Sequence, residues 1–211
     1  FGDWSSDVCS SDLSAAAARA LDEAAIRDYG LSSPVLVESA GMACARSLRE
    51  RFPDRLAAVA PARPLVVLAG AGNNAADALC MARRLCADQP FAPETVTVVL
   101  RSRADAERGA DSAFAANLRA LSRMGARVLP WDADADAARD ALRRSSLVLD
   151  GLAGTGLSGP LSGPSLDMAR AASGVFTVAV DVPSGLHDRW RPGDPLVRAD
   201  ATLAIEPVKS C

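Results

Sequence analysis

Short apolar runs alternate with longer segments of helical character along most of this chain, and no other feature constrains the fold as strongly. The runs are rich in valine and leucine and lack a polar residue at every second position. This pattern is typical of strands that are buried on both faces of a parallel sheet. The expected strands cover residues 64–70, 95–100, 126–130, 146–152, 175–182 and 201–205.

Helix-like segments separate these runs, as the crossover connections of a parallel sheet require. The expected crossover helices cover residues 75–88, 105–124, 133–144 and 164–173. The alternation predicts an α/β fold: a Rossmann-like, doubly wound and mostly parallel sheet with helices on both faces.

Two further helices are expected before the first strand, packed on the sheet. The first begins after Ser14 as N-cap and stops at Gly30. Its apolar face carries Leu21, Ala25 and Ile26. The second begins at Ser33-Pro34 and runs to about Arg51, with the proline in the first turn, where its missing N–H costs nothing.

Composition narrows the function classes. The 211 residues are 49% hydrophobic and 23% charged, as expected for one soluble globular domain. A net charge of -3 argues against nucleic acid as a partner, and no apolar run approaches the roughly 18 residues of a membrane span. Five cysteines without regular spacing and a single histidine, His187, favour a reducing, cytoplasmic location and offer no zinc cluster. We expect His187 at the surface.

The first 13 residues differ in character from the rest. The stretch DWSSDVCSSDL at 3–13 has neither a strand nor a helix period, and its reverse translation resembles a common short-read sequencing adapter. We therefore expect residues 1–13 to be an artefact and residues 14–211 to form the domain, truncated at its C-terminus.

Three polar, glycine-containing loops follow three of the expected strands. They are GAGNNAAD after the first, Asp150 with GLAGTGLSGP after the fourth, and Asp181 with VPSG after the fifth. In an open parallel sheet, ligands bind beyond the carboxyl ends of the strands. A carboxylate at the end of a hydrophobic strand is costly without partners, which favours functional roles for Asp150 and Asp181.

One interpretation of the first loop is a dehydrogenase's cofactor loop, because Gly70-x-Gly72-x-x-Ala75 has the outline of a dinucleotide fingerprint. That fingerprint expects an acidic ribose partner at the end of the next strand. Arg101-Ser102-Arg103 stands there instead, which leaves only an NADP enzyme open. The paired amides and Asp77 have no role in such a fingerprint.

Four motifs together resemble the YjeF N-terminal family, whose enzymatic members are NAD(P)H-hydrate epimerases. They are PVLVESAG at 34–41, GAGNNAADA at 70–78, DGLAGTGL at 150–157 and VDVPSG at 180–185. The resemblance covers about residues 21–209. It implies an enzyme that interconverts the R and S epimers of NADHX and NADPHX, the hydrates that carry a hydroxyl at C6 of the reduced ring.

The resemblance also implies roles for individual residues. A potassium ion would be held by Asn74, Asp150 and Ser184, whose side chains all offer oxygen. Asp181 would be the catalytic group, which protonates the departing hydroxyl and activates the returning water. The implied substrate-binding residues are Asn73, Asn74, Ala75, Ala76, Asp77, Gly154, Thr155, Gly156, Leu157, Ser158, Gly159, Pro160 and Asp181.

Two alternatives stay open at this point. Ala75, Ala76 and Ala78 stand where the family has glycines, and they would strain a loop that needs positive φ but suit a first helical turn. The family also has non-catalytic members, so a nucleotide-binding or scaffold module is a second interpretation. As partners the resemblance implies a second copy in a homodimer and a fused or separate dehydratase.

Overall fold

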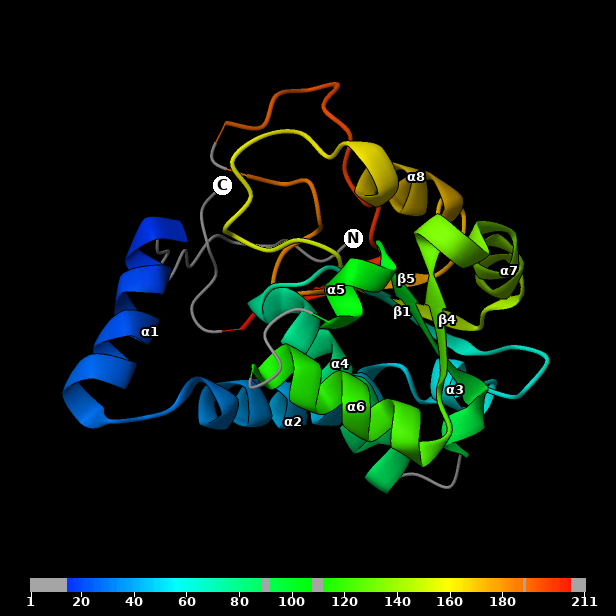
Figure 1. Ribbon diagram of the computed structural model, residues 1–211, viewed down its shortest axis with the longest axis horizontal. Coiled ribbons are helices and arrows are strands. Elements are labelled where there is room, and N and C mark those ends of the chain that lie inside the picture. Colours follow the sequence, from blue (N-terminus) through cyan, green and yellow to red (C-terminus); the bar gives the residue numbers. More distant parts are fainter. Residues whose placement is uncertain (1–14, 89–91, 108–111, 188, 206–211) are drawn as a thin grey trace, which may run out of the picture.

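The computed structural model describes residues 15–88, 92–107, 112–187 and 189–205, which form a parallel sheet with helices on both faces (Figure 1). The strand order is β3-β2-β1-β4-β5-β6, and every neighbouring pair is parallel. The expected fold class and all six expected strands are therefore confirmed. The strands are β1 Leu65–Ala69, β2 Val96–Leu100, β3 Arg127–Pro130, β4 Leu147–Gly151, β5 Thr177–Val180 and β6 Ala201–Leu203.

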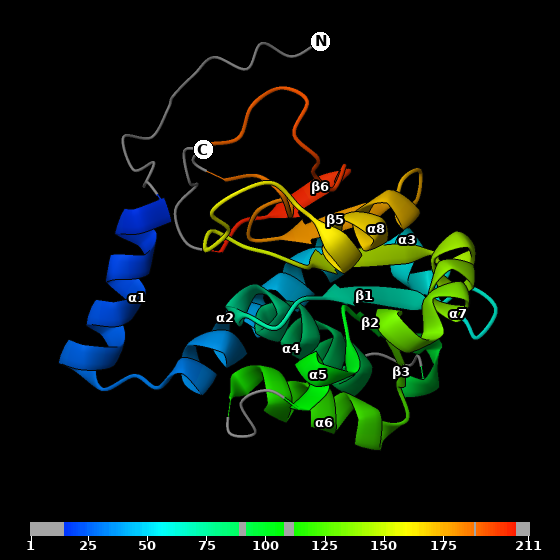
Figure 2. The same ribbon diagram turned by 45° about the horizontal axis from the view of Figure 1, so that its top comes forward.

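Two layers of helices enclose the sheet. Helices α2, α4 and α6 share one apolar core with the sheet, and α7 and α8 share a second core on its other face (Figure 2). The helices are α1 Ala15–Tyr29, α2 Ser33–Arg51, α3 Pro53–Ala57, α4 Asn73–Asp88, α5 Arg103–Glu107, α6 Ala113–Met124, α7 Trp131–Arg144 and α8 Gly163–Ala171, with a 3₁₀ turn η1 at Pro93–Thr95. None of the helices in the described part of the chain has the length and apolar character of a membrane span.

Several helix boundaries differ from the expectation. The single helix expected over 105–124 is two helices, α5 and α6, and the second has its own N-cap because the Ser112 hydroxyl accepts a hydrogen bond from the Ala115 N–H. Helix α4 begins at Asn73, two residues earlier than expected, so both asparagines lie in its first turn. The short α3 and η1 had no periodic signal in the sequence.

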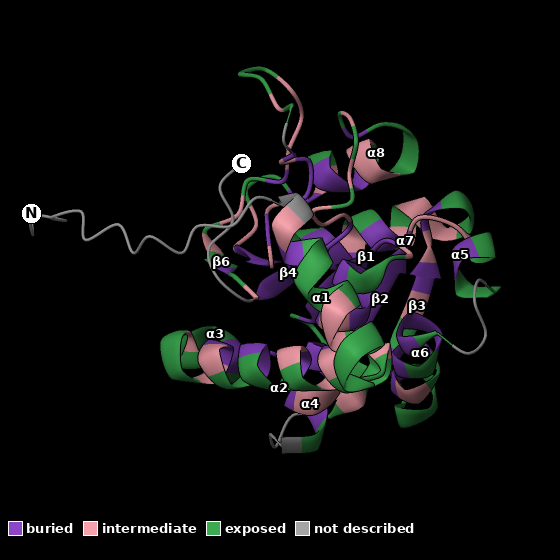
Figure 3. Cartoon of the chain, turned by 90° about the vertical axis from the view of Figure 1, so that its left-hand side faces the viewer, coloured by how far each residue is buried: buried purple, intermediate pink, exposed green. Residues whose placement is uncertain are grey.

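Helix α1 does not pack on the sheet, contrary to the expectation. It projects from the body of the molecule (Figures 1 and 2), and most of its residues are exposed or of intermediate burial (Figure 3). Leu21 and Ile26 on its apolar face are 51% and 45% exposed, so the described part of the chain does not cover that face. Gly30 ends the helix with a φ of +68°, as expected for a glycine stop. The expected N-cap, Ser14, lies outside the described residues.

The order of the strands places the ends of β1 and β4 side by side. Ala69 is in register with Gly151, and the Gly70 N–H donates to the Gly151 carbonyl at 3.1 Å. A Cβ at Gly70 would lie 2.1 Å from the Leu152 carbonyl oxygen, so only glycine permits this approach. This is the point where the chain reverses its direction across the sheet, and a crevice opens there in such folds.

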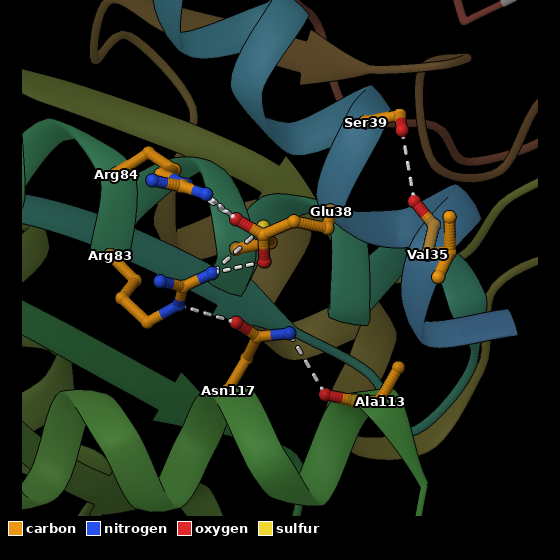
Figure 4. A network of polar contacts seen from close by, with 8 residues as sticks. Val35, Glu38, Ser39, Arg83, Arg84, Ala113 and Asn117 are labelled. Atoms are coloured by element: carbon orange, nitrogen blue, oxygen red, sulfur yellow. Dashed lines mark hydrogen bonds and ion pairs between the residues drawn. The ribbon is translucent and has the colours of Figure 1, made fainter. Parts of the chain in front are cut away.

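A polar network joins α2, α4 and α6 on one side of this crevice (Figure 4). The Glu38 carboxylate of α2 accepts hydrogen bonds from Arg83 and Arg84 of α4. The Arg83 Nε also donates to the Asn117 Oδ1 of α6 at 2.8 Å, and the Asn117 amide donates to the Ala113 carbonyl at 2.9 Å. The network fixes α4, the helix that carries the first motif loop, between its two neighbours.

Close backbone approach supports the same contact between α2 and α4. A Cβ at Gly41 would lie 2.6 Å from the Cys80 Sγ, so a side chain at this position would separate the helices. Glu38 and Gly41 both belong to the PVLVESAG motif, and the structure gives each of them a helix-packing role.

Replacement of Glu38 by glutamine should destabilise the protein by about 1 kcal/mol at neutral pH, because it removes a partly exposed ion pair with two arginines. Burial alone raises the pKa of Glu38, but hydrogen bonds and charges from Arg84 and Arg83 outweigh it and hold this pKa below the ordinary 4.5. The carboxylate thus contributes stability above pH 4.5, and this contribution is lost as the pH falls through the lower folded-state value.

Urea unfolding of the wild type and Glu38→Gln from pH 7 downward tests this prediction. The difference in unfolding free energy should shrink below pH 4.5. Glu50→Gln is the matched control, since Glu50 lies on the same helix in an exposed pair with Arg46. A difference that grows on acidification would contradict the prediction.

Candidate active site

A cleft of about 420 Å³ lies at the carboxyl ends of β1, β4 and β5. The loop after β4 and the loop after β5 arch over this end of the sheet, coloured yellow and orange in Figures 1 and 2, and α1 stands beside them. The cleft is lined by Ala18, Arg19, Leu21, Asp22, Gly72, Asn73, Asn74, Ala75, Asp77, Leu152, Ala153, Gly154, Thr155, Gly156, Leu157, Asp181 and Ile205.

A fully buried carboxylate, Asp150, ties two of the motif loops together. Its Oδ2 accepts the Ser184 N–H at 2.8 Å, and its Oδ1 accepts the Ser184 hydroxyl at 2.6 Å and the Leu152 N–H at 3.2 Å. Burial raises the pKa of Asp150 from 3.8 to about 6, against the effect of these hydrogen bonds. A negative charge at this place is therefore costly, and a cation beside it would offset the cost.

Asn74 adds a third oxygen next to this pair. Its amide nitrogen donates to the Ala153 carbonyl at 3.0 Å, and the Ser184 Oγ lies 2.9 Å from the same carbonyl oxygen. The Asn74 Oδ1 is buried and has no hydrogen-bond partner among the described residues. A buried carbonyl oxygen without a donor is unusual in a folded protein.

These oxygens meet the needs of a cation with a single positive charge. The set contains one carboxylate, from Asp150, together with the neutral oxygens of Asn74, Ser184 and Ala153. Hard cations bind oxygen, and an unpartnered carbonyl oxygen is ready to coordinate one. The structure brings together the three side chains predicted for a metal. Nothing in the sequence indicated the backbone oxygen of Ala153.

Small residues let the loops approach one another. A Cβ at Gly154 would lie 3.0 Å from the Asn74 Cβ, and a Cβ at Gly151 would lie 2.6 Å from the Ala78 Cβ. Ala75, Ala76 and Ala78 lie in helix α4, and none of them has positive φ. The alanines therefore cause no backbone strain, and the possibility that they stand in a loop that needs positive φ is excluded.

Asp181 lines the cleft with a backbone φ of +68°, and its N–H donates to the Leu203 carbonyl at 2.9 Å. This left-handed conformation is uncommon for residues other than glycine, although aspartate and asparagine adopt it more readily than most, and residues that hold it cluster at functional sites. Burial, and then the charges of Asp77 and Asp181, raise the pKa of the nearby Cys44 thiol to about 12. Two carboxylates thus gather at this end of the cleft.

The residues predicted to bind substrate differ in their positions relative to the cleft. Asn73, Asn74, Ala75, Asp77, Asp181 and the stretch 154–157 line the cleft. Ala76 points into the core and is 1% exposed, and Ser158 lines an adjoining cavity, whereas Gly159 and Pro160 line neither space. Their roles in binding remain predictions.

The adjoining cavity measures about 440 Å³ and includes residues that the sequence did not indicate. Arg19 of α1 reaches across to the loop after β4, where its Nη1 donates to the Thr155 carbonyl at 2.6 Å. His187, expected at the surface, is instead 5% exposed. His187 and Arg189, both from the loop after β5, line the cavity.

Comparison with known proteins finds a family profile, curated relatives and a solved structure that each match most of this chain. The profile of the family described as YjeF-related protein N-terminus matches residues 33–211. The NAD(P)H-hydrate epimerase of Pirellula staleyi is 32% identical over 92% of this chain and 81% of its own length. The bifunctional NAD(P)H-hydrate repair enzyme Nnr of Salinibacter ruber is 35% identical over 94% of this chain, which spans only 36% of that relative. The crystal structure of yeast ynu0, YNL200c, is similar in fold, with a TM-score of 0.74 over 90% of this chain and 78% of that one at 22% identity.

Proposed function

The chain belongs to the YjeF-related N-terminal family, and from this premise we propose that it is an NAD(P)H-hydrate epimerase, an isomerase that interconverts the R and S forms of NADHX and NADPHX. The observation that carries the proposal is the position of Asp181. Asp181 lines the cleft that the three motif loops form, and it is the residue other than glycine that has positive φ in the described part of the chain.

The chemistry needs one proton donor and one water. The hydroxyl at C6 belongs to a hemiaminal, so the lone pair of the ring nitrogen forms a C=N bond as the C6–O bond breaks. Protonated Asp181 gives its proton to the departing oxygen, which leaves as water. Water then adds to C6 on the other face and returns a proton to the Asp181 carboxylate. The net change is inversion at C6, without oxidation or reduction.

A potassium ion fits the oxygens described above. Asn74, Asp150 and Ser184 would hold it, together with the Ala153 carbonyl. When bound, it would neutralise the buried Asp150 and hold the loops after β1, β4 and β5 in one arrangement. The chain's own residues would then keep the substrate ring facing Asp181.

A chromatographic assay tests the proposed function. The protein is given one purified epimer of NADHX in potassium buffer, and the other epimer is followed over time. Conversion well above the spontaneous rate is expected. A folded protein that binds NADHX without converting it would favour the alternative of a binding or scaffold module. Tight binding of intact NADP with hydride transfer would favour the dehydrogenase interpretation.

The proposal also extends to partners. Relatives of this chain include bifunctional repair enzymes whose length it covers only in part. We propose that its product is passed to a dehydratase, fused or separate, that consumes one epimer, and that the domain acts as a homodimer. Size-exclusion chromatography with light scattering tests the second of these statements.

A further inference from the structure

The cavity beside the cleft has a character of its own. We call it the cationic pocket: it is lined by Arg19, Thr155, Gly156, Leu157, Ser158, His187 and Arg189. Two arginines, a threonine, a serine and a histidine line a space of about 440 Å³, and none of the lining residues in the described part of the chain carries a carboxylate. This is the set of donors that recognises a phosphate group.

His187 supplies a second, independent observation. Its Nδ1 accepts the Arg189 N–H at 3.2 Å, which places the proton of a neutral imidazole on Nε2. This Nε2 is buried and has no hydrogen-bond partner among the described residues. A buried donor without an acceptor is costly, and His187 is one of the residues that line the pocket.

The pocket continues the cleft. The two spaces share Arg19, Thr155, Gly156 and Leu157 as walls. The carboxylates Asp22, Asp77 and Asp181 line the cleft alone, whereas His187 and Arg189 line the pocket alone and Arg19 lines both spaces. A hydrated reduced dinucleotide has the matching polarity, since its reduced ring is uncharged and its phosphates are anionic.

We propose that the cationic pocket binds a phosphate group of the dinucleotide and thereby fixes the direction in which the substrate lies, with the ring to be epimerised toward Asp181. This inference rests on the proposed function. The phosphate is either part of the pyrophosphate bridge, which both substrates carry, or the 2'-phosphate, which only NADPHX carries.

Calorimetric titration with inorganic pyrophosphate tests the pocket directly, because it needs no catalysis. We expect Arg189→Gln to weaken binding about tenfold or more, the usual effect of losing a charged hydrogen bond. Arg189 is exposed, and glutamine keeps the backbone N–H that bonds His187, so the fold should be unaffected. Arg191→Gln is the matched control, since Arg191 is exposed on the same loop and does not line the pocket.

Steady-state kinetics then identify which phosphate is bound. An equal rise in KM for NADHX and NADPHX with Arg189→Gln assigns the pyrophosphate, and a rise for NADPHX alone assigns the 2'-phosphate. The inference is overturned if the wild type does not bind pyrophosphate, or if Arg189→Gln and Arg191→Gln weaken it equally. A wild type that binds pyrophosphate but epimerises nothing would refute the proposed function and leave the anion site standing.

Discussion

Replacement of Asp181 by asparagine should lower kcat for NADHX epimerisation by about two to four orders of magnitude, the usual contribution of a general acid–base group. The amide cannot donate a proton to the departing hydroxyl or accept one from the incoming water. KM should change little, because asparagine has nearly the same shape and polarity. The measurement is the rate at which the second epimer appears, with initial rates fitted over a range of substrate concentrations.

Asparagine is the right replacement because of the backbone. Asp181 has a φ of +68°, and asparagine is one of the few residues besides glycine that adopt this region readily. An unfolding midpoint close to that of the wild type will show that only chemistry was lost. Asp136→Asn, at a fully exposed position of α7, controls for the change in charge. Full activity in Asp181→Asn would remove Asp181 from the mechanism.

Replacement of Asp150 by asparagine should have the largest effect on stability and on the response to potassium. The carboxylate accepts two backbone N–H groups, one on each oxygen. An amide in either orientation places its NH₂ against one of them, so a buried donor loses its acceptor at a cost of about 1–3 kcal/mol. The negative charge that the cation would neutralise is lost as well.

Thermal unfolding in potassium chloride and in choline chloride of equal ionic strength measures the effect of Asp150→Asn on the response to potassium. The wild type should melt at a higher temperature in potassium, because a bound ion stabilises the folded state by mass action. Asp150→Asn should show no such difference, and Asp136→Asn should behave as the wild type. An equal response to both salts in the wild type would indicate that no potassium is bound.

The sheet could be predicted from the sequence because its four central strands, β2, β1, β4 and β5, are buried throughout and are largely apolar in sequence. The crossovers followed from the same alternation. The uncovered face of α1 could not be predicted, since periodicity reports that Leu21 and Ile26 share a face but not whether anything packs against it. The division into α5, which ends at Glu107, and α6, which begins at Ala113, could not be predicted because both segments have helical character in the sequence.

Prediction of the site from the sequence has the same limit, because sequence patterns do not report which groups meet in the folded protein. Motif similarity indicated Asn74, Asp150 and Ser184. The structure places Asp150 against the Ser184 hydroxyl, and Ser184 and Asn74 against one backbone carbonyl oxygen. That oxygen belongs to Ala153, whose side chain carries no chemical signal. The contact of Arg19 with the loop after β4 could not be predicted for a different reason. Its partner Thr155 lies 136 residues further along the chain, and only the folded molecule brings the two residues together.

The position of the site between β1 and β4 also bears on the order of folding events. Strand β1 pairs with the nearby β2, but its pairing with β4 joins Leu65 to Leu147 and must close a far longer loop. The groups around Asp150 meet only after that closure, so their contacts should be weakly formed in the transition state. Stopped-flow experiments on Asp150→Asn should therefore show faster unfolding and nearly unchanged refolding.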